Sequence, residues 1–106
     1  MAKILIVDDE EGIRYTSQQF LTERGYEVST AVGYESALDL VGKVKFDLIF
    51  IDIVLEGKTG IDLLREMKKM YSNCPIIMIT GSPDVDSASE AVRLGAFDYI
   101  PKPLRQ

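Results

Sequence analysis

Five residues whose side chains can do chemistry follow short apolar runs in this chain: Asp8, Asp9, Asp52, Thr80 and Lys102. Carboxylates can ligate a hard cation such as Mg²⁺ or attack a phosphoryl group to form an acyl phosphate. A hydroxyl and an ammonium can both bind a phosphoryl oxygen, and the ammonium also neutralises charge on it. Brought together, these residues would supply the groups that a phosphoryl transfer needs.

The three carboxylates would repel one another if they shared a site. At an effective dielectric constant of about 20, each like-charge pair roughly 4 Å apart costs about 4 kcal/mol. A divalent cation or a nearby ammonium would offset this repulsion; otherwise one carboxyl group stays protonated. Mg²⁺ suits such a site because it takes oxygen ligands and works with one or two carboxylates plus a phosphate. Asp52 is the candidate nucleophile, and the Thr80 hydroxyl is a candidate partner for a phosphoryl oxygen.

The apolar runs predict strands near residues 3–7, 26–30, 47–52, 76–80 and 98–100. Short apolar runs of this kind are typical of strands buried on both faces of a parallel sheet. Because helical segments separate them, the pattern predicts a doubly wound α/β domain with right-handed crossovers. Ligands of such sheets bind beyond the carboxyl ends of the strands, so the five residues should meet at one edge. A lone polar residue at a strand end usually caps a helix or begins a turn, but that does not explain all five in this order.

Helix boundaries are clearest for the first and last helices. The first is expected over residues 11–24, with Glu10 and Glu11 at its positive end. The last is expected to begin with Ser82 as N-cap and Pro83 as its first residue.

Composition bounds the class of protein. A chain of 106 residues forms one domain, and its net charge of −5 argues against nucleic-acid or anionic-membrane binding, which needs clustered Lys and Arg. No apolar run reaches the ~18–20 residues of a membrane span. The absence of histidine excludes Ser-His-Asp catalysis, His-ligated zinc and a phosphodonor histidine in this chain. Cys74 is expected to be a buried or half-buried free thiol in the reducing cytoplasm, where we expect the protein to be.

Four segments of the chain carry a family resemblance. They are ILIVDDE at 4–10, DLIFID at 47–52, ITG at 79–81 and GAFDYIPKP at 95–103. On these motifs the chain resembles the receiver domain of two-component response regulators over essentially all of its length. The terminal Lys-Pro combined with the double aspartate and the central aspartate is specific to this family. The Lys-Pro alone, or the aspartates alone, would be weak evidence for it.

The resemblance implies a flavodoxin-like fold with strand order 2-1-3-4-5. It also implies that Asp52 accepts a phosphoryl group from the phosphohistidine of a histidine kinase or phosphotransfer protein, or from a small acyl phosphate. Lys102 should pair with the phosphoryl group, Thr80 should move toward it, and Tyr99 should change between outward and inward rotamers. The peptide between Lys102 and Pro103 should be cis.

The metal and the partners are likewise implied by the resemblance. Asp9 and Asp52 should ligate Mg²⁺, or Mn²⁺, directly, with the Val54 carbonyl as a third protein ligand and Asp8 acting largely through water. The switch should control an output domain or a partner protein. The domain is not expected to be an enzyme, although it should assist its own phosphorylation and dephosphorylation.

The sequence departs from the family pattern near the site. Glu56 stands where the family often has proline, and Thr59 stands where it often has an acidic or small residue. Val54 cannot hydrogen-bond an attacking water, whereas Ser82, at the other position that tunes hydrolysis, can.

Other functions use parts of this pattern. A phosphohydrolase of the haloacid-dehalogenase type needs a second aspartate two residues after the nucleophile, where Val54 stands. A receiver-like binding module without phosphoryl turnover typically lacks one of the acidic residues or the lysine, and all are present here. A Rossmann or P-loop nucleotide binder would need a Gly-rich loop after the first strand, and this chain has none.

The receiver fold ends in a helix for which the few residues after the fifth run leave no room. Residues 1–106 are therefore expected to form a receiver domain truncated after the fifth strand. The first helix alone would then shield its face of the sheet, leaving Leu5, Val7, Ile49 and Ile51 partly exposed. Because an exposed apolar patch usually recruits a partner, we expect self-association or marginal stability.

Overall fold

The computed structural model describes residues 1–55, 58–70, 73–81 and 83–102. Within them, five strands alternate with four helices. Their bounds are β1 Lys3–Val7, α1 Glu11–Glu23, β2 Glu27–Ala31, α2 Tyr34–Lys43, β3 Leu48–Asp52, α3 Gly60–Met70, β4 Ile76–Thr80, α4 Val85–Arg93 and β5 Asp98–Pro101. None of the described helices is long and apolar enough to cross a bilayer.

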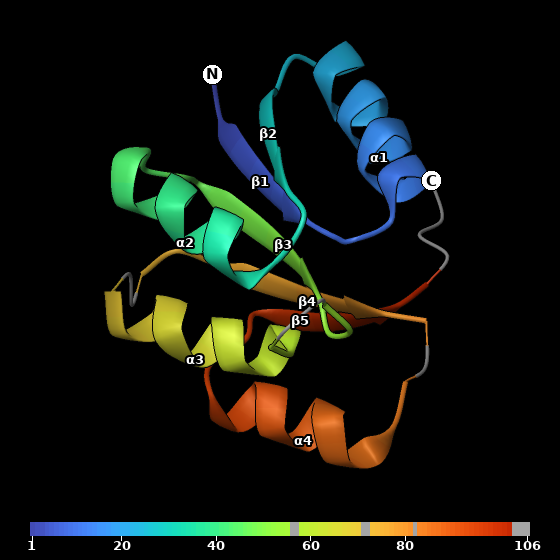
Figure 1. The fold of residues 1–106 in the computed structure, drawn as a ribbon, viewed down its shortest axis with the longest axis vertical. Coiled ribbons are helices and arrows are strands. Elements are labelled where there is room, and N and C mark those ends of the chain that lie inside the picture. The colour runs from blue at the N-terminus through green and yellow to red at the C-terminus, as the bar shows by residue number, and fades with distance from the viewer. Residues whose placement is uncertain (56–57, 71–72, 82, 103–106) are drawn as a thin grey trace.

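The strands form one parallel sheet in the order β2-β1-β3-β4-β5 (Figure 1). The predicted α/β class and strand order are therefore confirmed. Strand order reverses between β1 and β3, whose register pairs Ile4 with Leu48 and Val7 with Ile51. The chain leaves these two strands toward opposite faces, which opens the sheet edge beyond Val7 and Asp52 to a ligand.

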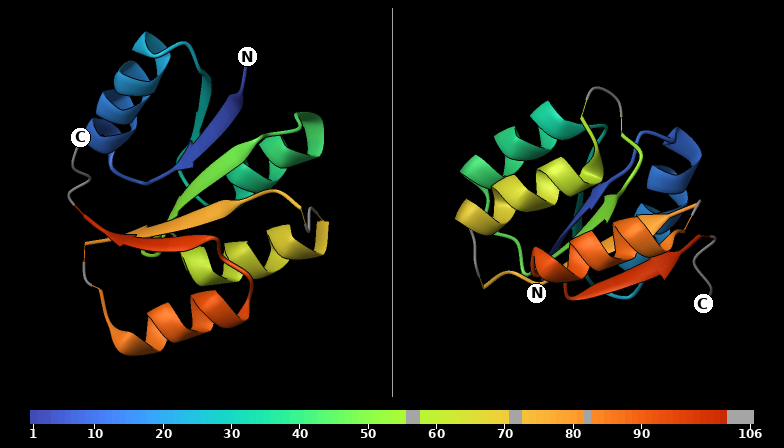
Figure 2. Two further views of the ribbon diagram at one scale, coloured as in Figure 1. Left: turned by 180° about the vertical axis from the view of Figure 1, so that it is seen from behind. Right: turned by 90° about the horizontal axis from the view of Figure 1, so that it is seen from below.

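Helix α1 covers one face of the sheet, and α2, α3 and α4 cover the other (Figure 2). The larger core lies on the three-helix side. Its fully buried side chains come from alternate strand positions and from the inner face of α3, and they include Leu5, Val7, Ile49, Ile51, Met78, Leu63, Leu64 and Met67. Because successive strand side chains point to opposite faces, one residue in two of each strand reaches this core.

The predicted exposure of Leu5, Val7, Ile49 and Ile51 is wrong. Each of these side chains is at most 1% exposed, because each points toward α2, α3 and α4 rather than toward α1. Leu48 and Phe50, alternate residues of β3 that point to the α1 side, are half-buried. Self-association rested on exposure of those four residues, and it stays a prediction.

Helix α4 begins two residues later than the sequence indicates, at Val85 instead of Pro83. Its N-cap is Asp84, whose backbone is extended and whose Oδ1 accepts a hydrogen bond of 2.8 Å from the amide of Ser87. The predicted N-cap, Ser82, lies outside the described residues, and the assignment of Pro83 to the first helical position is wrong. A carboxylate is as good an N-cap as a hydroxyl and adds favourable charge at the positive end of the helix, so Asp84 takes the role.

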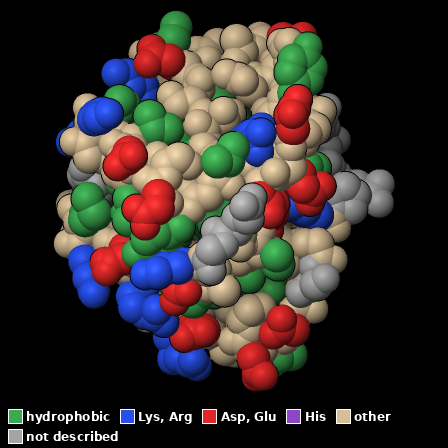
Figure 3. Space-filling view, in the orientation of Figure 1, with side chains coloured by type: hydrophobic (Ala, Val, Ile, Leu, Met, Phe, Trp, Pro, Cys, Tyr) green, Lys and Arg blue, Asp and Glu red, His purple; other side chains and the backbone are tan. Residues whose placement is uncertain are grey.

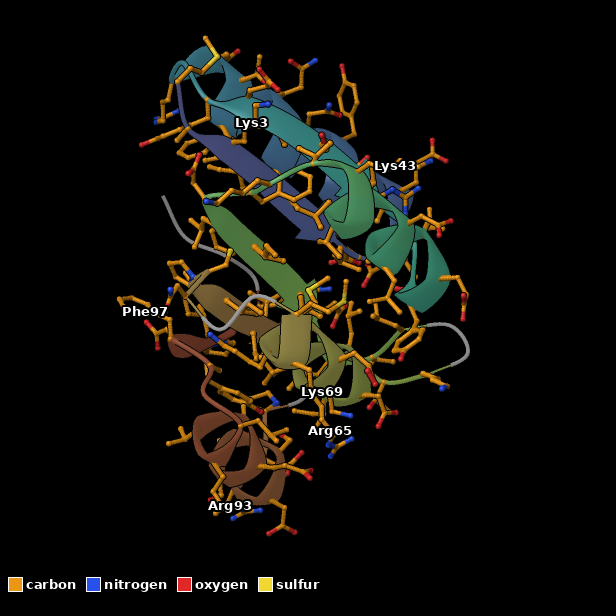
Figure 4. All side chains as sticks on the ribbon, turned by 90° about the vertical axis from the view of Figure 1, so that its left-hand side faces the viewer. Lys3, Lys43, Arg65, Lys69, Arg93 and Phe97 are labelled. Atoms are coloured by element: carbon orange, nitrogen blue, oxygen red, sulfur yellow. The ribbon has the colours of Figure 1, made fainter. Side chains whose placement is uncertain are left out.

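Charged side chains of both signs are interleaved over α3 and α4, toward the lower left of Figure 3. Arg65 joins the two helices because its guanidinium contacts Asp62 at 3.0 Å and Glu90 at 3.3 Å. Arg65, Lys69 and Arg93 project outward on this side of the molecule (Figure 4). Pairs this exposed contribute little individually, so α3 and α4 are held mainly by their apolar faces.

Gly60 brings the start of α3 against the backbone that carries Asp52. Its amide donates to the carbonyl of Ile53 at 2.7 Å. A Cβ at this position would overlap the carbonyl oxygen of Asp52 and would lie 2.8 Å from the Cα of Ile53. Only glycine therefore permits this approach.

We predict that Gly60→Ala lowers the free energy of unfolding by about 1–3 kcal/mol, because the added methyl group overlaps fixed backbone. Gly42→Ala is the matched control, since no atom lies within 4 Å of a Cβ there and the residue is helical. The control should leave stability unchanged or raise it by up to about 1 kcal/mol. Urea unfolding of both variants measures the difference, and equal shifts would contradict the close approach.

Candidate functional site

Side chains from three of the strand ends meet at the carboxyl edge of the sheet. Asp8 follows β1, Asp52 ends β3 and Lys102 follows β5. The Lys102 ammonium lies 2.9 Å from Asp52 Oδ2 and 3.0 Å from Asp8 Oδ2. The predicted convergence of these three residues is thus observed. They lie far apart in the sequence, and the parallel sheet brings them together because it aligns the carboxyl ends of β1, β3 and β5 at one edge.

These groups are withdrawn from water. The side chain of Asp8 is 0% exposed, that of Asp52 4% and that of Lys102 12%. The backbone holds the lysine in place, since its amide donates to the carbonyl of Thr80 at 2.7 Å. Two buried carboxylates therefore share one ammonium, and the inner site carries an excess of negative charge.

The pKa values of the central pair reflect this arrangement. Burial raises the pKa of Asp52, and the hydrogen bonds from Lys102 and from the Val54 amide oppose that rise without cancelling it. Burial alone would lower the pKa of Lys102, but its hydrogen bond to Asp52 and its ion pair with Asp8 outweigh that effect and raise its pKa above the usual range. The ammonium consequently stays charged throughout the physiological range.

The acidic residues could hold a metal ion. Asp8, Asp9, Glu10 and Asp52 each offer a carboxylate oxygen, and these oxygens lie within 4.8 Å of one another. Asp8 Oδ2 is buried and accepts no hydrogen bond within the described part of the chain, so its only partner there is the ammonium of Lys102. An all-oxygen donor set with uncompensated charge fits a hard cation such as Mg²⁺.

Asp9 and Glu10 are exposed, unlike Asp8 and Asp52. Sequence reasoning placed Asp9 at the site but assigned Glu10 only to the positive end of the first helix. In the structure the Glu10 carboxylate lies 3.3 Å from the ammonium of Lys102. The one sequence signal for this contact is the position of Glu10 directly after the paired aspartates.

Val54 orients the candidate nucleophile through its backbone. Its amide donates to Asp52 Oδ1 at 3.1 Å, while its side chain is exposed. Metal ligation by the Val54 carbonyl stays a prediction. The expectations for Glu56, for Ser82 and for the peptide between Lys102 and Pro103 fall outside the described residues.

Thr80 and Tyr99 lie on the neighbouring strands β4 and β5. Thr80 is buried at the end of β4, opposite Pro101 in the register. The Tyr99 ring packs against the core, and its hydroxyl lies 2.8 Å from Ser87 Oγ and accepts a hydrogen bond of 3.3 Å from the Asp84 amide. Tyr99 thereby ties β5 to the first turn of α4. Movement of either residue stays a prediction.

Comparison with known proteins decides the family. The model of the response regulator receiver domain matches residues 4–106. The chain belongs to this family. The receiver domain explains why paired aspartates, a central aspartate and a lysine meet at one sheet edge, and it places the chain in two-component signalling.

Individual relatives agree with this assignment. Sporulation initiation phosphotransferase F of Bacillus subtilis is 37% identical over 96% of the receiver chain and 82% of its own length. Regulatory protein AtoC of Escherichia coli is 37% identical, but the match covers 22% of that protein. A response regulator protein from Burkholderia pseudomallei, solved with a phosphorylated aspartic acid, calcium ion and citrate, superposes with a TM-score of 0.94 at 31% identity, covering 99% of this chain and 62% of that one.

We predict opposite stability effects for the two members of the central pair. Lys102→Met should lower the free energy of unfolding by about 3–5 kcal/mol, because it leaves two buried carboxylates without their cation. Asp52→Asn should raise the unfolding temperature in metal-free buffer, because it removes one of two buried negative charges. Asp39→Asn, an exposed site on α2, is the control for the amide substitution.

The benefit of Asp52→Asn should depend on pH. Since the folded pKa of Asp52 is raised above 3.8, its proton stabilises the fold at low pH, and this stabilisation is lost as the pH rises through the folded pKa. The stability difference between Asp52→Asn and wild type should therefore grow with pH above about 4. Thermal unfolding over a pH series measures it. A constant difference would contradict the raised pKa.

Proposed function

We propose that Asp52 is the phosphoacceptor, and that it takes a phosphoryl group from the phosphohistidine of a histidine kinase or phosphotransfer protein, or from a small acyl phosphate. The observation that carries this proposal is the buried Asp52 carboxylate held 2.9 Å from Lys102 within the acidic group. The phosphorylated aspartic acid of the Burkholderia pseudomallei relative supports it.

In the proposed step, an oxygen of the Asp52 carboxylate attacks the phosphorus and forms a new O–P bond. The bond from phosphorus to the donor nitrogen or oxygen breaks, and its electron pair leaves with the donor. The Lys102 ammonium already lies beside the reacting carboxylate, so it can neutralise the phosphoryl group without moving far. The Val54 amide keeps the carboxylate oriented.

Mg²⁺, or Mn²⁺ in its place, would be held directly by Asp9, Asp52 and the Val54 carbonyl, with Asp8 acting largely through water. When bound, the metal would neutralise charge on the phosphoryl oxygens. The buried, negatively charged Asp8 and Asp52 favour its binding by attraction. The calcium ion of the Burkholderia pseudomallei relative agrees with a cation in such a domain.

The proposed switch runs through Thr80 and Tyr99. The phosphoryl group draws the Thr80 hydroxyl toward Asp52, and the space that this side chain leaves admits the Tyr99 ring. Because the Tyr99 hydroxyl contacts Ser87 and Asp84, a change of rotamer alters what holds the first turn of α4. The surface of α4 and β5 would then differ between the two states.

This changed surface would act on an output domain or a separate partner protein. The match to AtoC covers 22% of that protein, so in that relative the domain is one part of a longer chain. The domain is a phosphoacceptor and not an enzyme, although its own residues assist phosphorylation and dephosphorylation. We place this function in the cytoplasm, without direct contact to nucleic acid or membrane.

Incubation with a small acyl phosphate and Mg²⁺ tests the proposal. Wild type and the control Asp39→Asn should gain one phosphoryl group by intact-mass measurement, whereas Asp52→Asn should gain none. Asp9→Ala should bind Mg²⁺ at least about tenfold more weakly and lose phosphorylation at wild-type metal concentrations. Phosphorylation of Asp9→Ala at the wild-type rate would remove the role assigned to Asp9.

The switch is tested with Thr80→Val, which replaces a hydroxyl by a methyl group of similar size. Phosphorylation should persist, because Thr80 is not the acceptor, but the NMR signals of the Tyr99 ring should no longer shift on phosphorylation. Thr30→Val, on β2 and away from the site, is the matched control and should behave as wild type. Equal Tyr99 shifts in wild type and Thr80→Val would refute the coupling.

A further inference from the structure

The ammonium of Lys102 is surrounded by a third carboxylate in addition to the buried pair. Glu10 Oε1 lies 3.3 Å from Lys102 Nζ, compared with 2.9 Å for Asp52 and 3.0 Å for Asp8. Two of these contacts are hydrogen bonds from the ammonium, to Asp52 and to Glu10, whereas the contact with Asp8 is an ion pair. A phosphoryl oxygen that binds Lys102 therefore competes with carboxylates that already hold it.

The three carboxylates differ in how easily they can be displaced. Asp8 is fully buried and Asp52 nearly so, whereas the Glu10 side chain is 62% exposed. Asp52 itself becomes an acyl phosphate and loses its carboxylate charge, so Asp8 and Glu10 are the carboxylates that remain beside Lys102. Buried Asp8 would be left uncompensated if it lost its ammonium, which is costly. The exposed Glu10 carboxylate can exchange the lysine for water at little cost. Glu10 is thus the partner that Lys102 gives up first.

The backbone of Glu10 is fixed while its side chain is left free to reach the lysine. Its amide donates to Asp8 Oδ1 at 2.9 Å, and its carbonyl accepts from the Arg14 amide at 3.1 Å. Glu10 is the N-cap residue of α1, yet its side chain makes no capping hydrogen bond. The carboxylate therefore contacts Lys102 instead of the helix amides, contrary to the role at the helix end that its sequence position indicates.

We propose that Glu10 is a positioning residue that accepts a hydrogen bond from Lys102 before phosphorylation and competes with the incoming phosphoryl oxygen for the ammonium. This inference rests on the proposed function of Asp52. Glu10 then sets how readily the site accepts a phosphoryl group, without touching the phosphorus. Removing its charge while keeping its shape should free one donor of Lys102 and tighten binding of a phosphoryl group.

Glu11 provides a matched control. It is the next residue, carries the same charge and lies exposed in the first turn of α1, but it makes no ion pair with Lys102 in the described structure. Glu11→Gln therefore changes the net charge of the protein as Glu10→Gln does and leaves the lysine contacts intact.

The test is titration of the full chain with beryllofluoride, a tetrahedral mimic of an aspartyl phosphoryl group, at Mg²⁺ concentrations that saturate each variant. We expect Glu10→Gln to bind the mimic about two- to five-fold more tightly than wild type, the range of one partly exposed ion pair. Glu11→Gln should give a smaller change, because exposed charges outside the pair are screened. The ¹⁵N signal of the Lys102 ammonium, recorded without mimic, should shift in Glu10→Gln and not in Glu11→Gln.

Each outcome bears on a different statement. Tighter binding and a shifted Lys102 signal in Glu10→Gln alone would support the competition. Equal effects of the two substitutions, or no effect of Glu10→Gln, would overturn it while leaving the phosphoacceptor role of Asp52 intact. Failure of the wild-type chain to bind the mimic would overturn the proposed function, and the competition with it.

Discussion

The structure of this site depends on one ammonium shared between two buried carboxylates. Lys102 comes from the end of β5, and its partners Asp8 and Asp52 come from β1 and β3. Without the lysine, two negative charges would stand in a site almost closed to water, which would strongly destabilise the fold. The same ion pairs therefore join three strand ends. The other acidic side chains at the site, Asp9 and Glu10, lie around these ion pairs.

The charge balance at the site affects the stability of the fold and the attraction for a cation in opposite directions. One cation for two buried anions leaves a deficit of positive charge. Burial, with a smaller effect of the nearby Asp8 charge, raises the pKa of Asp52. A fully compensated site would be more stable but would attract a metal ion less strongly. The exposed Asp9 and Glu10 deepen the local negative charge where solvent can screen it, so they add attraction for a cation without further burial.

The sequence predicted the sheet and the convergence at its edge because buried parallel strands leave a strong, local apolar signal. It failed where the outcome depends on which face of the sheet a side chain takes, or on a contact between residues far apart in the sequence. The exposure assigned to Leu5 and Ile49 was wrong because a continuous apolar run does not tell which face each residue takes. Glu10 was missed because its partner Lys102 lies 92 residues away, and a helix-end role explained it locally. The N-cap of α4 was misplaced because Ser82 and Asp84, which stand two residues apart, are both residue types that cap helices.

The close approach at Gly60 has a mechanical consequence. The first residue of α3 touches the backbone of Asp52 with no side chain between them, and a hydrogen bond to Ile53 fixes the contact. There is no compressible layer at this joint. A displacement of the Asp52 backbone would therefore bear directly on the first turn of α3. The same helix packs Leu63, Leu64 and Met67 into the core on the three-helix side, so only one turn of helix separates the candidate nucleophile's backbone from that core.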